Sequence, residues 1–466
     1  MKKSLSLVYA VVAASTLVAA CSTTDTAQPA DTTSGASSTA APDSTAATGN
    51  TAAETTTAGS GQSAETAWAL AYTGGTAAAA SGDPIKVGYV NQENFFPENT
   101  IGVNAAVEFI NTELGGVGGR PIELVPCTVT VAEDGTKCGT ELANNAEVAL
   151  VLTGTLLFGN KELYDALNGN KPVILGNGVT ADDFTTTAGV SFFSGGPGVN
   201  AGLAIFIRDF LKDTKSVAVI ANNDPAAQAA ANAIFKPIMD KAGIPTTIVS
   251  IDPTASAADV QSALTAVGAD KADVLVPIVT IQQCINVYDS VVALGIDPTV
   301  VTTGLCFGTP LTDHLAEAGE KGTVPNGWYF GDYGYSPYMS DPENGTDTMR
   351  VKLQEYGVPS PGATTLEWTG FAGPSFANAL TMAKILNTLG ADKALDVKAV
   401  DTALRGFTGP MLQQAGPLSC GKQVIAGIPV FVALCASQMG IHQYKDGEWL
   451  SIADELKGNA IDTSAG

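Results

Sequence analysis

Short, uninterrupted runs of valine, isoleucine and leucine recur through most of this 466-residue chain, and segments with helical spacing separate them. Val148–Thr153, Val217–Ala221 and Val274–Val279 are examples. A strand without polar alternation is buried on both faces, which is typical of a parallel sheet. Parallel neighbours need a crossover connection, and the intervening helices supply it. The pattern therefore predicts an α/β protein built on doubly wound parallel sheets.

The alternation of strand and helix runs twice along the chain. The first series extends from Ile85 to Leu175 and the second from Ala201 to Thr303. Together with the C-terminal third of the chain, the two series exceed the length at which one core stops growing, roughly 300 residues. Two lobes are therefore expected, and the C-terminal third should complete both and supply hinge crossings. The predicted bounds are 84–200 plus about 328–416 for lobe 1, and 201–327 plus about 417–455 for lobe 2.

The first residues are typical of an export signal. Lys2 and Lys3 precede an apolar run from Leu5 to Ala20, which is too short and wrongly flanked to span a membrane. Residues 1–20 are therefore expected to be a signal peptide. Cys21 directly follows Val-Ala-Ala, which resembles the bacterial lipobox and implies cleavage before Cys21 and a lipid on its sulfur. The alternative is an ordinary secreted protein with a chance cysteine at the cut site.

Residues 21–83 consist largely of Ala, Thr, Ser and Gly, and from Ser22 to Gly82 they contain no Lys or Arg. Such a segment buries too little apolar surface to offset the entropy of ordering. We expect a disordered tether, interrupted by one apolar patch, Ala67–Tyr72, to which no function is assigned. The mature protein is thus expected outside the cytoplasm, at the cell membrane, in contact with that membrane only through its lipid.

Cysteine usage agrees with export. Six cysteines remain besides Cys21, and an even number in an oxidising compartment indicates disulfides. Six cysteines allow 15 pairings, and pairing between neighbours in sequence is the prediction: Cys127 with Cys138, Cys284 with Cys306, and Cys420 with Cys435. Metal binding is the rival interpretation. No C-x-x-C occurs and the chain has only two His, so no metal site is expected.

The net charge of −23 argues against nucleic acid and anionic membrane surfaces as partners. Enzyme chemistry is not indicated either. The only histidines are His314 and His442, and neither lies beside a strand-end loop where a base could activate a nucleophile. We therefore expect no catalytic residues and no cofactor.

The stretch Asn111–Leu124, NTELGGVGGRPIEL, is similar to the helix-to-strand turn of the branched-chain amino-acid-binding (Leu/Ile/Val-binding) family. These are the type I extracytoplasmic solute-binding proteins of ABC importers. Weaker similarities come in the family's order at Gly154–Gly159, Val217–Asp224 and Trp368–Phe371. The resemblance implies two lobes joined by a three-crossing hinge, a non-enzymatic monomer, and a small-molecule ligand bound between the lobes for delivery to permease subunits. A ligand sensor of the same fold is the alternative role.

Ligands of open α/β sheets bind at the carboxyl ends of the strands, so the candidate site residues are those in the strand-end loops. In lobe 1 they are Asn91, Gln92, Phe95, Thr155, Leu156, Leu157, Phe158, Asn177, Gly178 and Val179. In lobe 2 and near the hinge they are Asn222, Asp224, Thr280, Gln282, Leu305, Phe307 and Tyr333.

The site departs from the pattern that the resembling family implies. Leu157 and Phe158 stand where that family has paired serines, and Val179 stands where it has a threonine. Leu305 or Cys306 stands where it has an acidic residue for the ligand's ammonium group. A buried zwitterion without such partners is costly, so the sequence predicts a neutral or largely apolar ligand, including aromatic ones. The alternative is a register shift of one or two residues, with Thr153 or Thr155 binding the carboxylate of a branched-chain amino acid.

Overall fold

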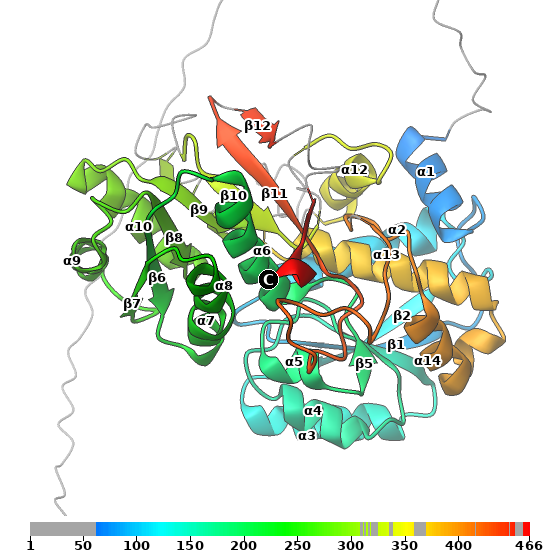
Figure 1. The fold of residues 1–466 in the computed structure, drawn as a ribbon. Coiled ribbons are helices and arrows are strands. Elements are labelled where there is room, and N and C mark those ends of the chain that lie inside the picture. The colour runs from blue at the N-terminus through cyan, green and yellow to red at the C-terminus, as the bar shows by residue number, and fades with distance from the viewer. Residues whose placement is uncertain are drawn as a thin grey trace, which may run out of the picture. The chain divides into compact units, whose positions relative to one another are not determined.

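The computed structural model describes residues 62–307, 325–334, 339–357, 370–414, 416–446, 448–452 and 460–466, together with Leu311, His314, Leu315 and Glu317. Within these residues the chain forms two separate sheets, each with helices on both faces, as the sequence predicts (Figure 1). None of the helices described has the length and apolar character that crossing a membrane requires.

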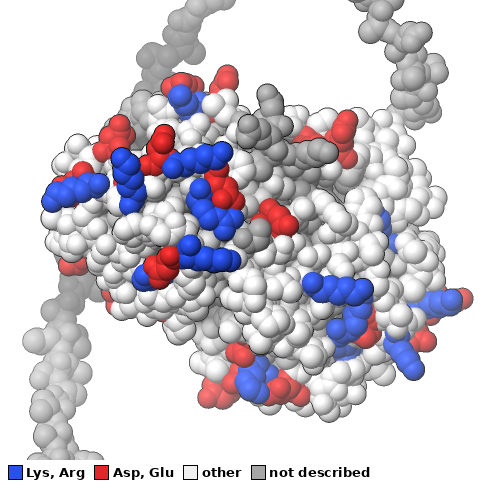
Figure 2. Space-filling view, in the orientation of Figure 1, with Lys and Arg blue, Asp and Glu red and all other residues white. Residues whose placement is uncertain are grey.

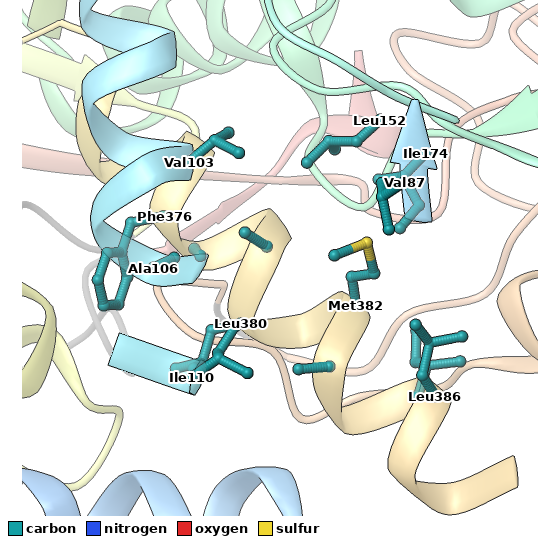
Figure 3. Packing of buried hydrophobic residues seen from close by; sticks show 14 of the residues in the cluster. Val87, Val103, Ala106, Ile110, Leu152, Ile174, Phe376, Leu380, Met382 and Leu386 are labelled. Atoms are coloured by element: carbon teal, nitrogen blue, oxygen red, sulfur yellow. The ribbon is translucent and has the colours of Figure 1, made fainter. Parts of the chain in front are cut away.

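The first sheet contains five parallel strands in the order β2-β1-β3-β4-β5. They are β1 (Ile85–Asn91), β2 (Ile122–Thr128), β3 (Val148–Thr153), β4 (Val173–Ile174) and β5 (Gly189–Val190). Helices α2 (Pro97–Glu113), α13 (Ala372–Leu389) and α14 (Val397–Gly406) pack on one face. Helices α3 (Ala132–Asn144) and α4 (Asn160–Leu167) pack on the other. Figure 3 shows part of the core on the α2 and α13 side, where Met382 of α13 lies near the strand residue Val87, and Phe376 of α13 lies beside Ala106 of α2.

The second sheet has the order β12-β11-β10-β9-β8-β6-β7, with β13 paired to β11. Its strands are β6 (Val217–Asn222), β7 (Thr246–Ile251), β8 (Val274–Ile278), β9 (Thr299–Thr303), β10 (Tyr329–Asp332), β11 (Gln438–Lys445), β12 (Glu448–Ser451) and β13 (Ala460–Asp462). Helix α6 (Gly195–Phe210) and the segment α7 (Pro225–Ala229), a π-helical turn (Ala230–Phe235) and α8 (Lys236–Lys241) cover one face. Helices α9 (Ala257–Val267) and α10 (Ile281–Leu294) cover the other.

The chain passes between the two sheets three times. It leaves the first after β5, returns to it after β10 and leaves it again before β11. Two expected bounds differ from these positions. Helix α6 packs wholly on the second sheet although the second lobe was expected to begin inside it, at residue 201. Strand β10 pairs with β9 and β11, so the return to lobe 1 comes after Asp332 and does not begin at about residue 328.

The last of these passages, residues 417–437, contacts both cores. Leu418 and Cys435 belong to the core of the first lobe, and Ile425 and Leu434 to that of the second. The apolar run Val430–Leu434 is not a regular strand; Leu434 forms a single bridge with Ser191. The placement of this passage entirely in lobe 2 is therefore corrected.

The end of the expected tether is folded. Helix α1 spans Ala64–Thr73. The hydroxyl of Ser63, the residue before it, caps the helix by accepting a hydrogen bond from the Thr66 N–H. The Tyr72 hydroxyl lies 2.8 Å from the Thr381 hydroxyl and accepts a hydrogen bond from the Leu412 N–H at 3.1 Å. The aromatic and apolar side chains of the Ala67–Tyr72 patch give this helix enough surface to pack on the first lobe. Residues after this helix are also held in place, since the Thr76 N–H donates to the Leu114 carbonyl at 3.0 Å and the Ala80 N–H to the Asn111 carbonyl at 2.7 Å. The prediction of disorder up to residue 83 is therefore wrong for residues 62–83, while residues 22–61 and Cys21 lie outside the described part of the chain.

The glycine-rich turn after α2 has a direct steric explanation. Gly115, Gly116, Gly118 and Gly119 all have positive φ, between 58° and 91°, a region that disfavours residues with a Cβ. The Val117 N–H donates to the Arg120 carbonyl at 2.8 Å and closes the turn. The chain can therefore reverse from α2 into β2 within a few residues.

Local capping also explains where α3 begins. The Asp134 carboxylate accepts hydrogen bonds from the N–H groups of Thr130 and Val131 at 2.8 and 3.1 Å. This satisfies donors at the helix start, so α3 begins at Ala132. Strand β3 has the expected bounds, and helix α12 spans Thr346–Tyr356.

The three expected disulfides are present in the structure, pairing Cys127 with Cys138, Cys284 with Cys306, and Cys420 with Cys435. The Cys127–Cys138 bridge joins the end of β2 to α3, and the other two lie near a predicted site residue or in a passage between lobes. Cys306 lies just after β9 and is tied to α10, and the Cys420–Cys435 bridge lies within the last passage. The disulfides therefore restrain the loops that surround the strand ends.

Candidate functional site

The polar residues predicted at the strand ends of lobe 1 come together in one hydrogen-bond network. The Asn91 amide donates to the Phe96 carbonyl at 2.9 Å, and its oxygen accepts from the Thr155 N–H at 3.2 Å. The Gln92 amide oxygen accepts from the Leu157 N–H at 2.7 Å. These bonds connect the loop after β1 with the loop after β3.

Asn99, in the first turn of α2, joins this network to the loop after β4. Its oxygen accepts hydrogen bonds from the Asn177 amide at 2.6 Å and from the Ser375 hydroxyl at 2.8 Å. Its own amide donates to the Thr155 hydroxyl at 3.1 Å. Asn99 and Ser375 were not predicted, because their contacts join residues far apart in the sequence.

The network is buried. Asn91, Gln92, Thr155 and Asn177 are at most 1% exposed. Their side chains hold the strand-end loops in place through bonds to one another. One acceptor is left over, because the Asn177 side-chain oxygen has no hydrogen-bond partner among the described residues.

Aromatic and apolar side chains form the exposed rim of this end of lobe 1. Phe95 is 56% exposed and Leu157 42% exposed. Phe95 contacts Phe96 and Phe158, each with ring centroids 6.4 Å apart, and Phe96 contacts Phe371 at 5.7 Å. Leu156, in contrast, is buried in the core. An apolar ligand surface is consistent with these exposed rings.

Asp183 fixes the turn that contains Gly178 and Val179. Its carboxylate accepts hydrogen bonds from the N–H groups of Val179 and Thr180 at 3.0 and 2.9 Å, and from the Tyr164 hydroxyl at 2.6 Å. Burial raises the pKa of Asp183 above its ordinary value, although these donors favour the charged form. The Val179 N–H is therefore already used within the lobe.

In lobe 2, Asn222 at the end of β6 receives a hydrogen bond from the Thr280 N–H at 2.7 Å. The Asn222 amide nitrogen is buried and has no hydrogen-bond partner among the described residues. Asp224 caps α7 by accepting from the N–H groups of Ala226 and Ala227, both at 3.0 Å. Gln282, in the first turn of α10, is exposed.

The structure places Phe307 differently from the other candidates. Its ring is 7% exposed and packs against Phe330, Tyr444 and Trp449, with centroids 4.6–5.4 Å apart. It therefore belongs to the core of lobe 2 and does not line an accessible surface. Leu305 is half-buried in the short turn after β9.

Tyr333 lies at the passage from lobe 2 back to lobe 1. Its ring stacks on Phe371 at 5.7 Å and contacts Phe193 at 6.1 Å. Burial, with added repulsion from Asp183 and Asp332, raises the pKa of the phenol well above its usual range. The hydroxyl therefore stays protonated and can donate a hydrogen bond.

Asp332, the last residue of β10, is a candidate that sequence reasoning missed. One of its carboxylate oxygens is buried without a hydrogen-bond partner among the described residues, and burial raises its pKa to about 7. Its position shortly after the aromatic run Trp328–Phe330 was a usable signal. The sheet order that brings it beside the end of β9 was not evident from the sequence.

Other surfaces of the described residues carry less information. A depression of about 420 Å³ lies between the end of α13 and α14, and none of the predicted site residues lines it. The described part of the chain has no group of three or more His, Cys, Asp or Glu side chains that could hold a metal ion. Acidic and basic side chains are interspersed on the face shown in Figure 2, without a continuous field of one sign.

Several solved structures that share this fold are proteins that bind solutes or substrates. One from R. palustris, in complex with 4-hydroxybenzoate, is 17% identical with a TM-score of 0.61, over 79% of this chain and 95% of that one. A leucine-binding protein from Thermotoga maritima is 13% identical with a TM-score of 0.59, over 78% of this chain and 97% of that one. An ABC transporter substrate-binding protein from Sphaerobacter thermophilus is 16% identical with a TM-score of 0.63, over 82% and 98%. At these identities the similarity establishes the fold.

A search of curated proteins finds no match to the sequence. The periplasmic binding protein family model, however, matches residues 84–426, which is most of the chain and includes the first sheet and strands β6 to β10 of the second. Members of such a family act outside the cytoplasm and bind small ligands. This chain therefore belongs to the periplasmic binding protein family.

Proposed function

We propose that this protein captures a small molecule between its two lobes and delivers it unchanged to the permease of an ABC importer. Family membership and the solute-binding neighbours support this role. So does the arrangement of two α/β lobes connected by three passages, which suits hinged closure around a ligand.

The ligand we propose is neutral or largely apolar, and aromatic compounds are the leading class. The observation that carries this proposal is the exposed Phe95 and Leu157 at the strand ends of lobe 1. The alternative carboxylate donor Thr155 is fully buried and bonded to Asn99, which argues against its direct contact with an amino-acid carboxylate. Thr153 is also buried, and its hydroxyl accepts a hydrogen bond from the Gly176 N–H.

Native mass spectrometry of freshly purified protein tests ligand capture directly. We expect a carried-over small molecule, and the protein's thermal midpoint to rise when that molecule is added back. Isothermal titration then compares leucine and valine with 4-hydroxybenzoate and benzoate. Micromolar binding of leucine would establish branched-chain amino-acid binding and end the proposal of an apolar ligand.

We also propose that lipid on Cys21 anchors the mature protein to the membrane. We expect the intact mass of wild-type protein to correspond to removal of residues 1–20 and addition of a lipid, and Cys21→Ala to lose the added mass and leave the membrane fraction. Ser22→Ala, a change next to the cut site, is the control that stays anchored. A wild-type mass without lipid would refute the anchor and leave the binding function untouched.

A further inference from the structure

Helix α1 precedes the part of the chain that the family model describes. That model begins at residue 84, whereas α1 (Ala64–Thr73) already packs on lobe 1. Ala69 belongs to the core of this lobe, and Trp68 and Tyr72 pack against it. A helix of 10 residues is marginal in water when it is isolated. The helix therefore depends on lobe 1 for its stability, so that its folding and its docking are one coupled event.

Polar groups of α1 contact four separate segments of lobe 1. The Trp68 indole N–H donates to the Glu343 carbonyl at 3.1 Å, in the turn before α12. The Thr66 hydroxyl donates to the Glu113 carboxylate at the end of α2. The Tyr72 hydroxyl contacts α13 and the loop that follows α14. The helix thus holds together segments that are far apart in the sequence.

The two aromatic rings of α1 have fitted seats on lobe 1. Gly345, the residue before α12, has a φ of 78°, and a Cβ at this position would overlap the Trp68 indole ring. Trp68 stacks on Tyr72 with ring centroids 4.9 Å apart, and the Lys384 Nζ lies 4.1 Å from the Tyr72 ring centroid, a cation–π contact. The apolar patch Ala67–Tyr72 therefore supplies the side chains that dock the helix.

The carboxylate that receives the Thr66 hydroxyl is fixed by α12. The Lys352 Nζ donates to Glu113 at 2.7 Å and the Tyr356 hydroxyl at 2.5 Å. Glu113 ends α2, and Asn99 of the strand-end network lies in the first turn of the same helix, about 20 Å away at 1.5 Å per residue. Helix α1 therefore docks at the end of α2 that lies away from the candidate ligand site.

We propose that α1 is a strap that fastens the N-terminal segment of the chain to lobe 1 and can detach while lobe 1 stays folded. The family model begins after α1, so the fold of lobe 1 does not require the strap, whereas the strap requires the lobe. This role does not depend on which ligand binds. Where the lipid proposed on Cys21 is present, lobe 1 is the part held to the membrane, and lobe 2 is left free to move during closure.

Limited proteolysis of the full mature chain tests the strap. Thermolysin cuts before apolar residues such as Leu70, and the mass of the remaining fragment identifies its first residue. We expect wild-type fragments to begin no later than Ala64. When docking is fast, cleavage inside α1 follows the population of the detached state. Trp68→Ala should therefore speed this cleavage about tenfold to a hundredfold, and the milder Tyr72→Phe roughly fivefold. The lobes of both variants should resist cleavage as the wild type does.

Ala71→Gln is the matched control, because Ala71 is exposed on the same helix. This variant should be cut like the wild type. Wild-type fragments that begin inside residues 64–73 from the start of digestion would show that α1 is not docked. If Trp68→Ala speeds cleavage of the lobes as much as cleavage of α1, the helix is an inseparable part of lobe 1, and the strap is refuted. Both outcomes leave the proposed ligand binding and the lipid on Cys21 untouched, since fragment masses are read without either.

Discussion

The Asp332→Asn variant is expected to be more stable than the wild-type protein at pH 8 when no ligand is present, and to differ little from it near pH 4. Asp332 has a pKa of about 7 in the folded chain, because it is buried, against 3.8 without the fold. At a pH between these two values, the Asp332 carboxyl keeps its proton in the folded state and releases it in the unfolded state. Stability therefore falls as pH rises through this window and levels off above it. The full shift corresponds to at most about 4 kcal/mol, which Asn avoids because it carries no charge.

Chemical unfolding at a series of pH values measures this difference. Glu98 also has a pKa raised to about 7, mainly by burial, and burial raises the pKa of Asp183 as well. The wild-type curve therefore contains several contributions, and the informative quantity is the difference between variant and wild type at each pH. A constant difference from pH 4 to pH 8 would show that Asp332 does not titrate in this window.

The Gly102→Ala variant is expected to destabilise the protein by about 2 kcal/mol. Gly102 lies inside α2, where alanine would ordinarily be preferred by up to about 1 kcal/mol. The structure reverses this preference, because a Cβ at Gly102 would overlap the backbone carbonyl of Ala372 at the start of α13. A backbone carbonyl in a helix cannot rotate away as a flexible side chain can, so the two helices must separate. Thermal or chemical unfolding of the variant measures the effect.

Gly406→Ala provides the control for this prediction. Gly406 ends α14, and no atom would lie within 4 Å of an added Cβ. This substitution should be neutral or slightly stabilising, so the two Gly-to-Ala changes should differ in sign. Equal effects at both positions would show that α2 and α13 do not approach each other closely at Gly102. Because Gly102 is one turn from Asn99, ligand titration of the same variant would show whether helix separation also disturbs the site.

The fold could be predicted from the sequence because each buried strand is marked by its own apolar run. Runs such as Val148–Thr153 are buried on both faces and must lie within a sheet that is covered twice. Caps such as Ser256, which accepts a hydrogen bond from the Asp259 N–H, then fix where helices begin. The errors occurred where a short segment depends on a distant surface. Helix α1 is one example, since it is ordered by contacts with α12 and α13 that its own composition does not indicate.

The candidate site could be predicted from the sequence only in part. The sequence identified the strand-end loops, and Asn91, Gln92, Thr155 and Asn177 do come together. It did not reveal that these residues are bonded to one another and buried, because that depends on Asn99 and Ser375 from helices α2 and α13. Whether a polar side chain is satisfied internally is a property of the packed structure and cannot be determined from its own position in the sequence.

The sequence by itself determined the class of protein, through the spacing of its buried strands, its glycine turn at Gly115–Gly119 and its paired cysteines. All three are local signals that act over a few residues. Only the tertiary structure decided which buried polar groups are left without a hydrogen bond. Asp332 and Gly304 lie in different parts of the chain and become neighbours only because β10 pairs with β9. Burial removes water from one carboxylate oxygen of Asp332 and supplies no hydrogen bond among the described residues in its place.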